Sequence, residues 1–147
     1  SIYPNDPAII QADAVSIKLY AYVNLSSATE TPVIVRFWVN AKQQLVETKW
    51  LATTLTNTHW NFSPTAQRDR ILADSVVPGS TLFRYFAGTA TPLNVPIGGI
   101  TDATARQSIS SVQVTFSVKS VGSNSSITMQ NTVGMPNLGL TRTGTGS

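Results

Sequence analysis

The chain of 147 residues contains no cysteine and few charged residues. The absence of cysteine excludes a disulfide framework, a thiolate zinc site and a cysteine nucleophile. Charged residues make up 12% of the chain, against about 25% in an average soluble globular protein. Serine, threonine, asparagine and glutamine must therefore cover much of the surface, a composition that is typical of extracellular β-proteins.

Long apolar runs are missing as well. No stretch of about 18 apolar residues occurs, so the sequence predicts no membrane-spanning helix within it. No charged segment followed by an apolar one opens the chain, so no secretory leader is predicted within it. We expect a single domain over residues 1–140, because its polar stretches are short enough to be loops. Residues 141–147 are interpreted as a flexible tail or a cloning scar.

Histidine is scarce, since His59 is the only one in the chain. A general base at His59 would need a serine or a carboxylate beside it, and no recognisable catalytic motif supplies one. We therefore interpret His59 as a loop residue stacked on Trp60. Asp13, Asp69 and Asp74 are too dispersed for a calcium loop. We expect no catalytic residue, no metal site and no cofactor, and hence a protein that is not an enzyme.

Basic residues outnumber acidic ones, giving a net charge of +3, but they are scattered along the chain. A nucleic-acid interface would combine a basic stripe with exposed aromatic residues. The nearest approach is Arg84 beside Tyr85 and Phe86, which we interpret as ordinary alternation within a strand. Nucleic acid is therefore not an expected partner, although Arg84, Lys42 and Lys49 leave DNA binding open.

The clearest structural signal is a hairpin over residues 110–133. Its first arm has an apolar residue at every second position, which gives a strand with one dry and one wet face. These residues are Val112, Val114, Phe116 and Val118. Residues 122–125 suit a tight turn, and the second arm repeats the alternation with Ile127 and Met129. Asn131 interrupts the apolar row, so it needs a hydrogen-bond partner or lies at the sheet margin.

Similar patterns predict the remaining elements. Further strands are expected over residues 15–24, 33–39, 44–51 and 81–86. Residues 8–14, behind Pro7, predict a helical turn or two, and residues 66–77 predict a second helix or turn near Arg70. Residues 52–65 are predicted as a loop packed by its own aromatic side chains. The expected fold is mainly β (α+β with a short N-terminal helix stub), with antiparallel sheets of about six or seven strands.

Three tryptophans, Trp38, Trp50 and Trp60, allow two interpretations. Aromatic rings exposed on a β-scaffold can form a platform for a ligand such as a sugar, and all three are candidates for it. Trp38 and Trp50 lie on strands predicted to pair, so they can equally be core residues, and core packing is the interpretation that we favour.

Four segments, taken in order, resemble the soluble headgroup of minor type IV filament subunits. The strand that follows the N-terminal helix in that family is matched by VSIKLYAYVN. Its next segment, P-x-x-V-x-F/Y-x-V with a return ending in an aromatic residue, is matched by PVIVRFWVNAKQQLVETKW. The piece leading into an F-x-Y strand is matched by RDRILADSVVPGSTLFRYF, and the closing hairpin by SVQVTFSVKS and ITMQNTVGMPN. The resemblance spans roughly residues 12–137 and is closest to J-type minor pseudopilins of type II secretion and related minor pilins.

The resemblance implies a pilin-like headgroup and a structural role in the assembly or capping of a type IV pilus or related secretion filament. It implies other pilin or pseudopilin subunits as partners, an extracellular location on the cell surface, and no small-molecule substrate. Family members carry a long apolar helix before the headgroup, so we expect such a helix before Ser1 and contact with the membrane only through it. The alternative is a secreted β-sandwich module that binds a carbohydrate or a surface.

Overall fold

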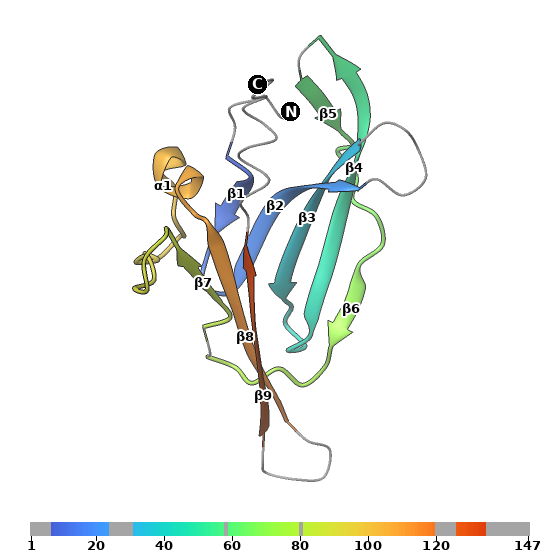
Figure 1. Cartoon of the computed structure of the whole chain (residues 1–147). Helices are drawn as coiled ribbons and strands as arrows, with labels where there is room; N and C mark the ends of the chain where they lie inside the picture. Colours follow the sequence, from blue (N-terminus) through green and yellow to red (C-terminus); the bar gives the residue numbers. More distant parts are fainter. Residues whose placement is uncertain (1–6, 24–30, 58, 80, 120–125, 135–147) are drawn as a thin grey trace.

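The computed structural model describes residues 7–23, 31–57, 59–79, 81–119 and 126–134, which are built mostly of strands (Figure 1). The elements, in chain order, are β1 (Ile9–Ala12), β2 (Ser16–Val23), β3 (Thr31–Val39), β4 (Leu45–Thr56), β5 (His59–Phe62), β6 (Arg70–Ala73), β7 (Phe83–Phe86), α1 (Ala103–Gln107), β8 (Ser111–Lys119) and β9 (Ser126–Gly134). All strand pairs are antiparallel, as the sequence predicts. The helical part of the described chain is limited to α1, which falls well short of what a membrane-crossing helix needs.

The larger sheet has the strand order β1-β2-β3-β4-β5, with β6 paired to β4 beside this path. Its three long strands correspond to those predicted over 15–24 and 44–51 and, from a continuous apolar run, over 33–39. β2 pairs with β3 from Ser16 opposite Trp38 to Val23 opposite Thr31. β3 pairs with β4 without a register shift, so alternate residues of the three strands lie on the same face.

The smaller sheet has the order β7-β8-β9 and contains the predicted closing hairpin. β8 and β9 pair in one continuous register, with Val114 opposite Asn131 and Phe116 opposite Met129. Asn131 is exposed, so the prediction that it lies at the sheet margin is confirmed. The predicted turn at 122–125 and the tail at 141–147 lie outside the described residues.

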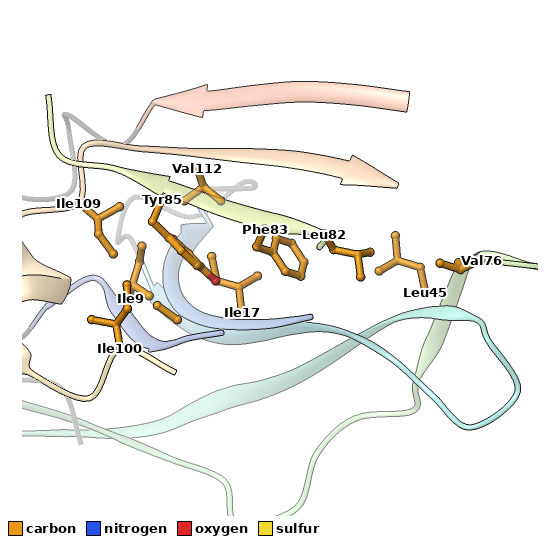
Figure 2. Packing of buried hydrophobic residues seen from close by; sticks show 11 residues of the cluster. Ile9, Ile17, Leu45, Val76, Leu82, Phe83, Tyr85, Ile100, Ile109 and Val112 are labelled. Atoms are coloured by element: carbon orange, nitrogen blue, oxygen red, sulfur yellow. The ribbon is translucent and has the colours of Figure 1, made fainter. Parts of the chain in front are cut away.

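The two sheets enclose the hydrophobic core (Figure 2). Tyr85 of β7 is fully buried between Val112 of β8 and the side of the larger sheet that carries Ile9 and Ile17. The buried cluster consists of Ile9, Ala12, Ile17, Leu45, Val76, Leu82, Phe83, Tyr85, Ile100, Ile109 and Val112. It draws on both sheets and on the segments that connect them, so the sheets are held together by one core.

The segment between β6 and β7 ties the two sheets through the backbone. The Val76 N–H donates to the Gln43 carbonyl at 2.9 Å, before β4. Val76 also forms an antiparallel bridge with Val118 of β8, and the Val77 N–H donates to the Ser117 carbonyl at 2.8 Å. After leaving the larger sheet, this segment therefore bonds to β8 on the same side as β7, beyond the point where β7 ends.

Helix α1 braces the first strand. Asp102 caps it by accepting a hydrogen bond from the Ala105 N–H at 2.9 Å. The Arg106 guanidinium donates to the carbonyls of Ile9 at 3.1 Å and Thr101 at 2.7 Å. These contacts fix α1 against the outer edge of β1.

The two predicted helical segments are corrected by the structure, although one short helix is present elsewhere in the chain. The prediction of an N-terminal helix stub over 8–14 is wrong, because Ile9–Ala12 form β1 and pair with β2. The prediction of a helical turn near Arg70 is also wrong, because Arg70–Ala73 form β6 and pair with β4. In both places backbone pairing with a long neighbouring strand outweighs local helical propensity.

The prediction of a loop over 52–65 is wrong for most of its length, because residues 52–56 and 59–62 are strand. β4 continues to Thr56, and His59–Phe62 return as β5, with a register shift between Ala52 and Thr54. The described residues therefore form nine strands, more than the predicted six or seven. The additional ones, β1, β5 and β6, have four residues each, too few for a clear alternation pattern.

Candidate functional site

The outer face of the larger sheet carries the aromatic residues singled out from the sequence. The inner face of this sheet presents Ile17 and Leu45 to the core. Alternate residues therefore point away from the core, and the registers place Trp38, Trp50 and Thr48 on that outer face. Trp38 and Trp50 are both half-buried and belong to no part of the buried core cluster, so the core packing favoured from the sequence is wrong. We call the surface formed by Lys18, Arg36, Trp38, Thr48 and Trp50 the outer aromatic face.

A cation lies over each of these two tryptophan rings. The Lys18 ammonium nitrogen is 4.5 Å from the Trp50 ring centroid, and the Arg36 guanidinium carbon is 4.6 Å from the Trp38 ring centroid. Contacts of this kind contribute about 0.5–1 kcal/mol each at exposed sites. Lys18 and Arg36 are also directly opposite each other on β2 and β3, so two like charges meet in one cross-strand pair. The attraction of each cation to its ring offsets part of the repulsion between Lys18 and Arg36.

A hydrogen-bond chain fixes the orientation of Trp38. Its indole N–H donates to the Thr48 hydroxyl oxygen at 2.9 Å, and that hydroxyl donates to the Asp69 carboxylate at 2.7 Å. Thr48 is buried, so the chain satisfies polar groups that would otherwise be costly beneath the surface. Arg36 is held in turn by a hydrogen bond from its Nε to the Ser16 hydroxyl at 3.2 Å. Both the ring and the cation above it are therefore pre-positioned.

Trp60 lies far from Trp38 along the larger sheet. It lies on β5 opposite Leu55, whereas Trp38 lies opposite Val46. Nine positions of an extended strand separate Leu55 from Val46, which corresponds to about 30 Å along β4. Trp38, Trp50 and Trp60 thus form an extended row, and one small ligand cannot contact all three.

The titratable residues considered from the sequence have local partners. His59 lies on β5 opposite Thr56, so its interpretation as a loop residue is wrong. The carboxylate of Asp13 accepts from the Ala14 N–H at 2.7 Å, and that of Asp74 accepts from the Ser75 N–H at 3.2 Å. Over the described ranges, no three histidine, aspartate or glutamate residues gather closely enough to hold a metal ion.

Sequence reasoning missed an apolar pocket between the two sheets. Its volume is about 380 Å³. It is lined by Ile17, Leu19, Phe37, Leu45, Leu72, Phe83, Val112 and Val114. Since the lining is entirely aliphatic and aromatic, the pocket can hold an apolar group by shape but offers it no hydrogen bond. The pocket follows from how two sheets stack, which no local pattern in the sequence specifies.

No protein-family model, curated protein or solved structure matches this chain. The outer aromatic face is therefore interpreted from its own chemistry. Among the described residues, no carboxylate lies within ion-pair distance of Lys18 or Arg36, and the ion pair that is present, Lys49 with Glu47 at 3.5 Å, lies on the other face of the sheet. The outer aromatic face thus presents two cations above aromatic rings, beside the Asp69 carboxylate that is bound to Thr48, and its excess of positive charge suits an anionic partner better than a neutral sugar.

Proposed function

We propose that the chain is the headgroup of a structural minor pilin or pseudopilin, which takes part in assembling or capping a type IV pilus or related secretion filament. The order of the four family-like segments carries this proposal. Each of the four contains strands of the same two-sheet fold: β2, then β3 with β4, then β6 with β7, and finally β8 with β9. Segments that are weak signals singly are thus parts of one packed unit, as expected if they derive from one domain.

In this role the protein acts by surface contact and does no chemistry. Its partners are other pilin or pseudopilin subunits, and its headgroup lies outside the cell. An apolar helix before Ser1 would join the filament core and would be the part in contact with the membrane before assembly. Exposed apolar side chains such as Leu51, Leu55 and Ile97 offer contact points for neighbouring subunits.

Site-specific cross-linking in the producing cell tests this proposal. The full gene product would carry a photoreactive amino acid at Leu55 or Ile97, which are exposed, and at the buried Tyr85 as a matched control. We expect adducts with filament subunits from the exposed positions and none from position 85. The absence of such adducts, together with a gene that lacks an apolar run of about 20 residues upstream of Ser1, would argue decisively against a filament role.

A second candidate function, a secreted module that binds carbohydrate or another surface, is favoured by the two cations of the outer aromatic face. Because Lys18 and Arg36 cover the rings of Trp50 and Trp38, this module would recognise an acidic glycan. Tryptophan fluorescence should then change with an acidic polysaccharide, and added salt should reverse the change. The Lys18→Gln/Arg36→Gln variant should not respond. Fluorescence that stays constant across acidic and neutral glycans eliminates this candidate.

A further inference from the structure

Strand β9 is a long edge strand that has no protection against pairing from the residues that the structure describes. It reads SITMQNTVG and contains no charged residue and no proline. Its register with β8 has no shift, so no β-bulge twists it away. Residues 128–132 are all exposed, and Figure 1 shows the β8–β9 hairpin reaching below the other strands. Natural proteins protect such edges with lysine, proline, bulges or covering segments.

The other edges of both sheets carry such protection. At β1, the Ile100 N–H donates to the Ala12 carbonyl at 2.7 Å, and Arg106 covers the Ile9 carbonyl. At β7, the Leu93 N–H donates to the Tyr85 carbonyl at 2.7 Å. β5 and β6 have only four residues each, and both pair with β4 through a register shift. Within the described part of the chain, β9 therefore differs from every other edge.

The outward backbone groups of β9 can be identified from the bonds of β8. The N–H groups of Thr115 and Lys119 and the carbonyl of Ser117 bond on the β7 side of β8. In an antiparallel sheet these groups alternate, so Val114 and Phe116 bond toward β9. The backbone groups of Asn131 and Met129, which are opposite these two residues, therefore bond to β8. The backbone N–H and carbonyl groups of Thr128, Gln130 and Thr132 point away from β8, toward the open edge of the sheet. No other described backbone group bonds to this outer side of β9.

We propose that β9 pairs antiparallel with β9 of a second copy of this chain, about a two-fold axis at Gln130. Gln130 is the middle residue of Ser126–Gly134, so pairing over the full strand places it opposite itself and places Thr128 opposite Thr132. β9 can pair with β9 of a second copy because the strand is uncharged. The chain carries a net charge of +3, but no like charges of the two β9 strands face each other. Each edge satisfies the outward groups of the other, as an isologous interface requires. This inference stands independently of the filament proposal.

Single-cysteine cross-linking tests the pairing and its register, since the chain has no cysteine of its own. Cα atoms of a hydrogen-bonded antiparallel pair lie about 5.5 Å apart, within the range that a disulfide spans. Gln130→Cys should therefore form a disulfide dimer on mild oxidation. Thr128→Cys and Thr132→Cys should cross-link when mixed and much less when oxidised separately. Thr104→Cys, on the exposed surface of α1, gives the rate for random collision.

Association without a cross-link is the second measurement. Light scattering should show the mass of the full chain rising from 15.8 kDa toward twice that value with concentration. Thr128→Lys/Thr132→Lys, which places lysines opposite each other, should weaken association at least about tenfold. Thr101→Lys/Thr104→Lys adds the same charge at other exposed positions and should leave association largely unchanged. The proposal is overturned if the wild-type chain stays at 15.8 kDa up to about 1 mM, or if Gln130→Cys cross-links no faster than Thr104→Cys.

Discussion

Tyr85 is the single residue that most directly links the two sheets. Its side chain is fully buried on β7, and its hydroxyl donates to the Asp13 carbonyl, between β1 and β2, at 2.7 Å. Burial raises the pKa of Tyr85 well above the ordinary value near 10, because the core solvates a phenolate poorly. The sequence alone indicates this residue only as part of a strand, FRYF.

The raised pKa of Tyr85 makes stability depend on alkaline pH. The folded pKa exceeds the unfolded one, so the contribution of Tyr85 is complete below pH about 10 and decreases as pH rises above it. Tyr85→Phe should lower the free energy of unfolding by about 1 kcal/mol at pH 7, through the lost hydrogen bond, and should flatten the decline above pH about 10. Urea unfolding from pH 7 to 11 measures both effects. Ile109→Val, a buried change without a titrating group, should shift the curve and keep its slope.

Thr48 is the second residue with a specific structural role. Thr48→Val keeps the shape of the side chain but leaves the Trp38 indole N–H and the Asp69 carboxylate without the hydroxyl that joins them. We expect a loss of about 1–3 kcal/mol in the free energy of unfolding and a shift in tryptophan fluorescence. Thr48→Ser retains the hydroxyl and should cost less. If Thr48→Val costs no more than Thr48→Ser, the hydroxyl contributes no more than the methyl group, which contradicts a dominant role for the hydrogen-bond chain.

At the scale of elements, the loop before α1 depends on one close backbone approach. Gly99 has φ +89°, and a Cβ at this position would lie 2.7 Å from the Ala12 carbonyl oxygen. That oxygen accepts the Ile100 N–H at 2.7 Å, so it cannot move away without weakening the cover over β1. Gly98 has a similar φ of +93°, but a Cβ there would have no heavy atom within 4 Å.

Substitutions at these two glycines distinguish the energetic cost of backbone strain from that of a steric collision. Gly98→Ala should cost about 1–2 kcal/mol in the free energy of unfolding, the typical penalty for a left-handed alanine. Gly99→Ala should cost more than about 3 kcal/mol, because the methyl group also collides with backbone. Chemical denaturation of the two variants side by side measures the difference. Equal losses would mean that the loop moves freely away from β1.

The sequence predicted the long strands and β7 but missed the short strands β1, β5 and β6 for a physical reason. β2, β4, β8 and β9 contain enough residues to show a period of two, and β3 is a continuous apolar run, so these strands could be predicted, together with the pairing of β3 with β4 and of β8 with β9. β1 and β6 contain four residues each, and their structure comes from pairing with β2 and β4. The candidate site was predictable only as a set of tryptophans, because the cations over Trp38 and Trp50 depend on the register between β2 and β3.

At the scale of the whole molecule, Phe83 and Phe86 lie on opposite sides of β7 and differ in burial. Phe83 is 2% exposed and lines the pocket between the sheets, whereas Phe86 is only half-buried. Phe83→Ala should cost about 3–5 kcal/mol in the free energy of unfolding, because it enlarges a space that is already incompletely filled. Phe86→Ala should cost clearly less. Thermal unfolding followed by near- and far-ultraviolet circular dichroism checks both, and separate transitions would contradict a single shared core.

The bridge between Val76 and Val118 has a consequence for how fast the chain folds. These residues are distant in sequence, and so are Val77 and Ser117, which are bonded beside them. The side of β8 next to β7 is therefore complete only after much of the chain between β6 and β8 has been closed into a loop. Such non-local pairing raises the entropic barrier, and β-sandwiches dominated by it fold in about milliseconds to seconds. Substitutions at Val76 should accordingly slow folding more than they speed unfolding in stopped-flow measurements, because the pairing that raises the barrier is formed in the transition state.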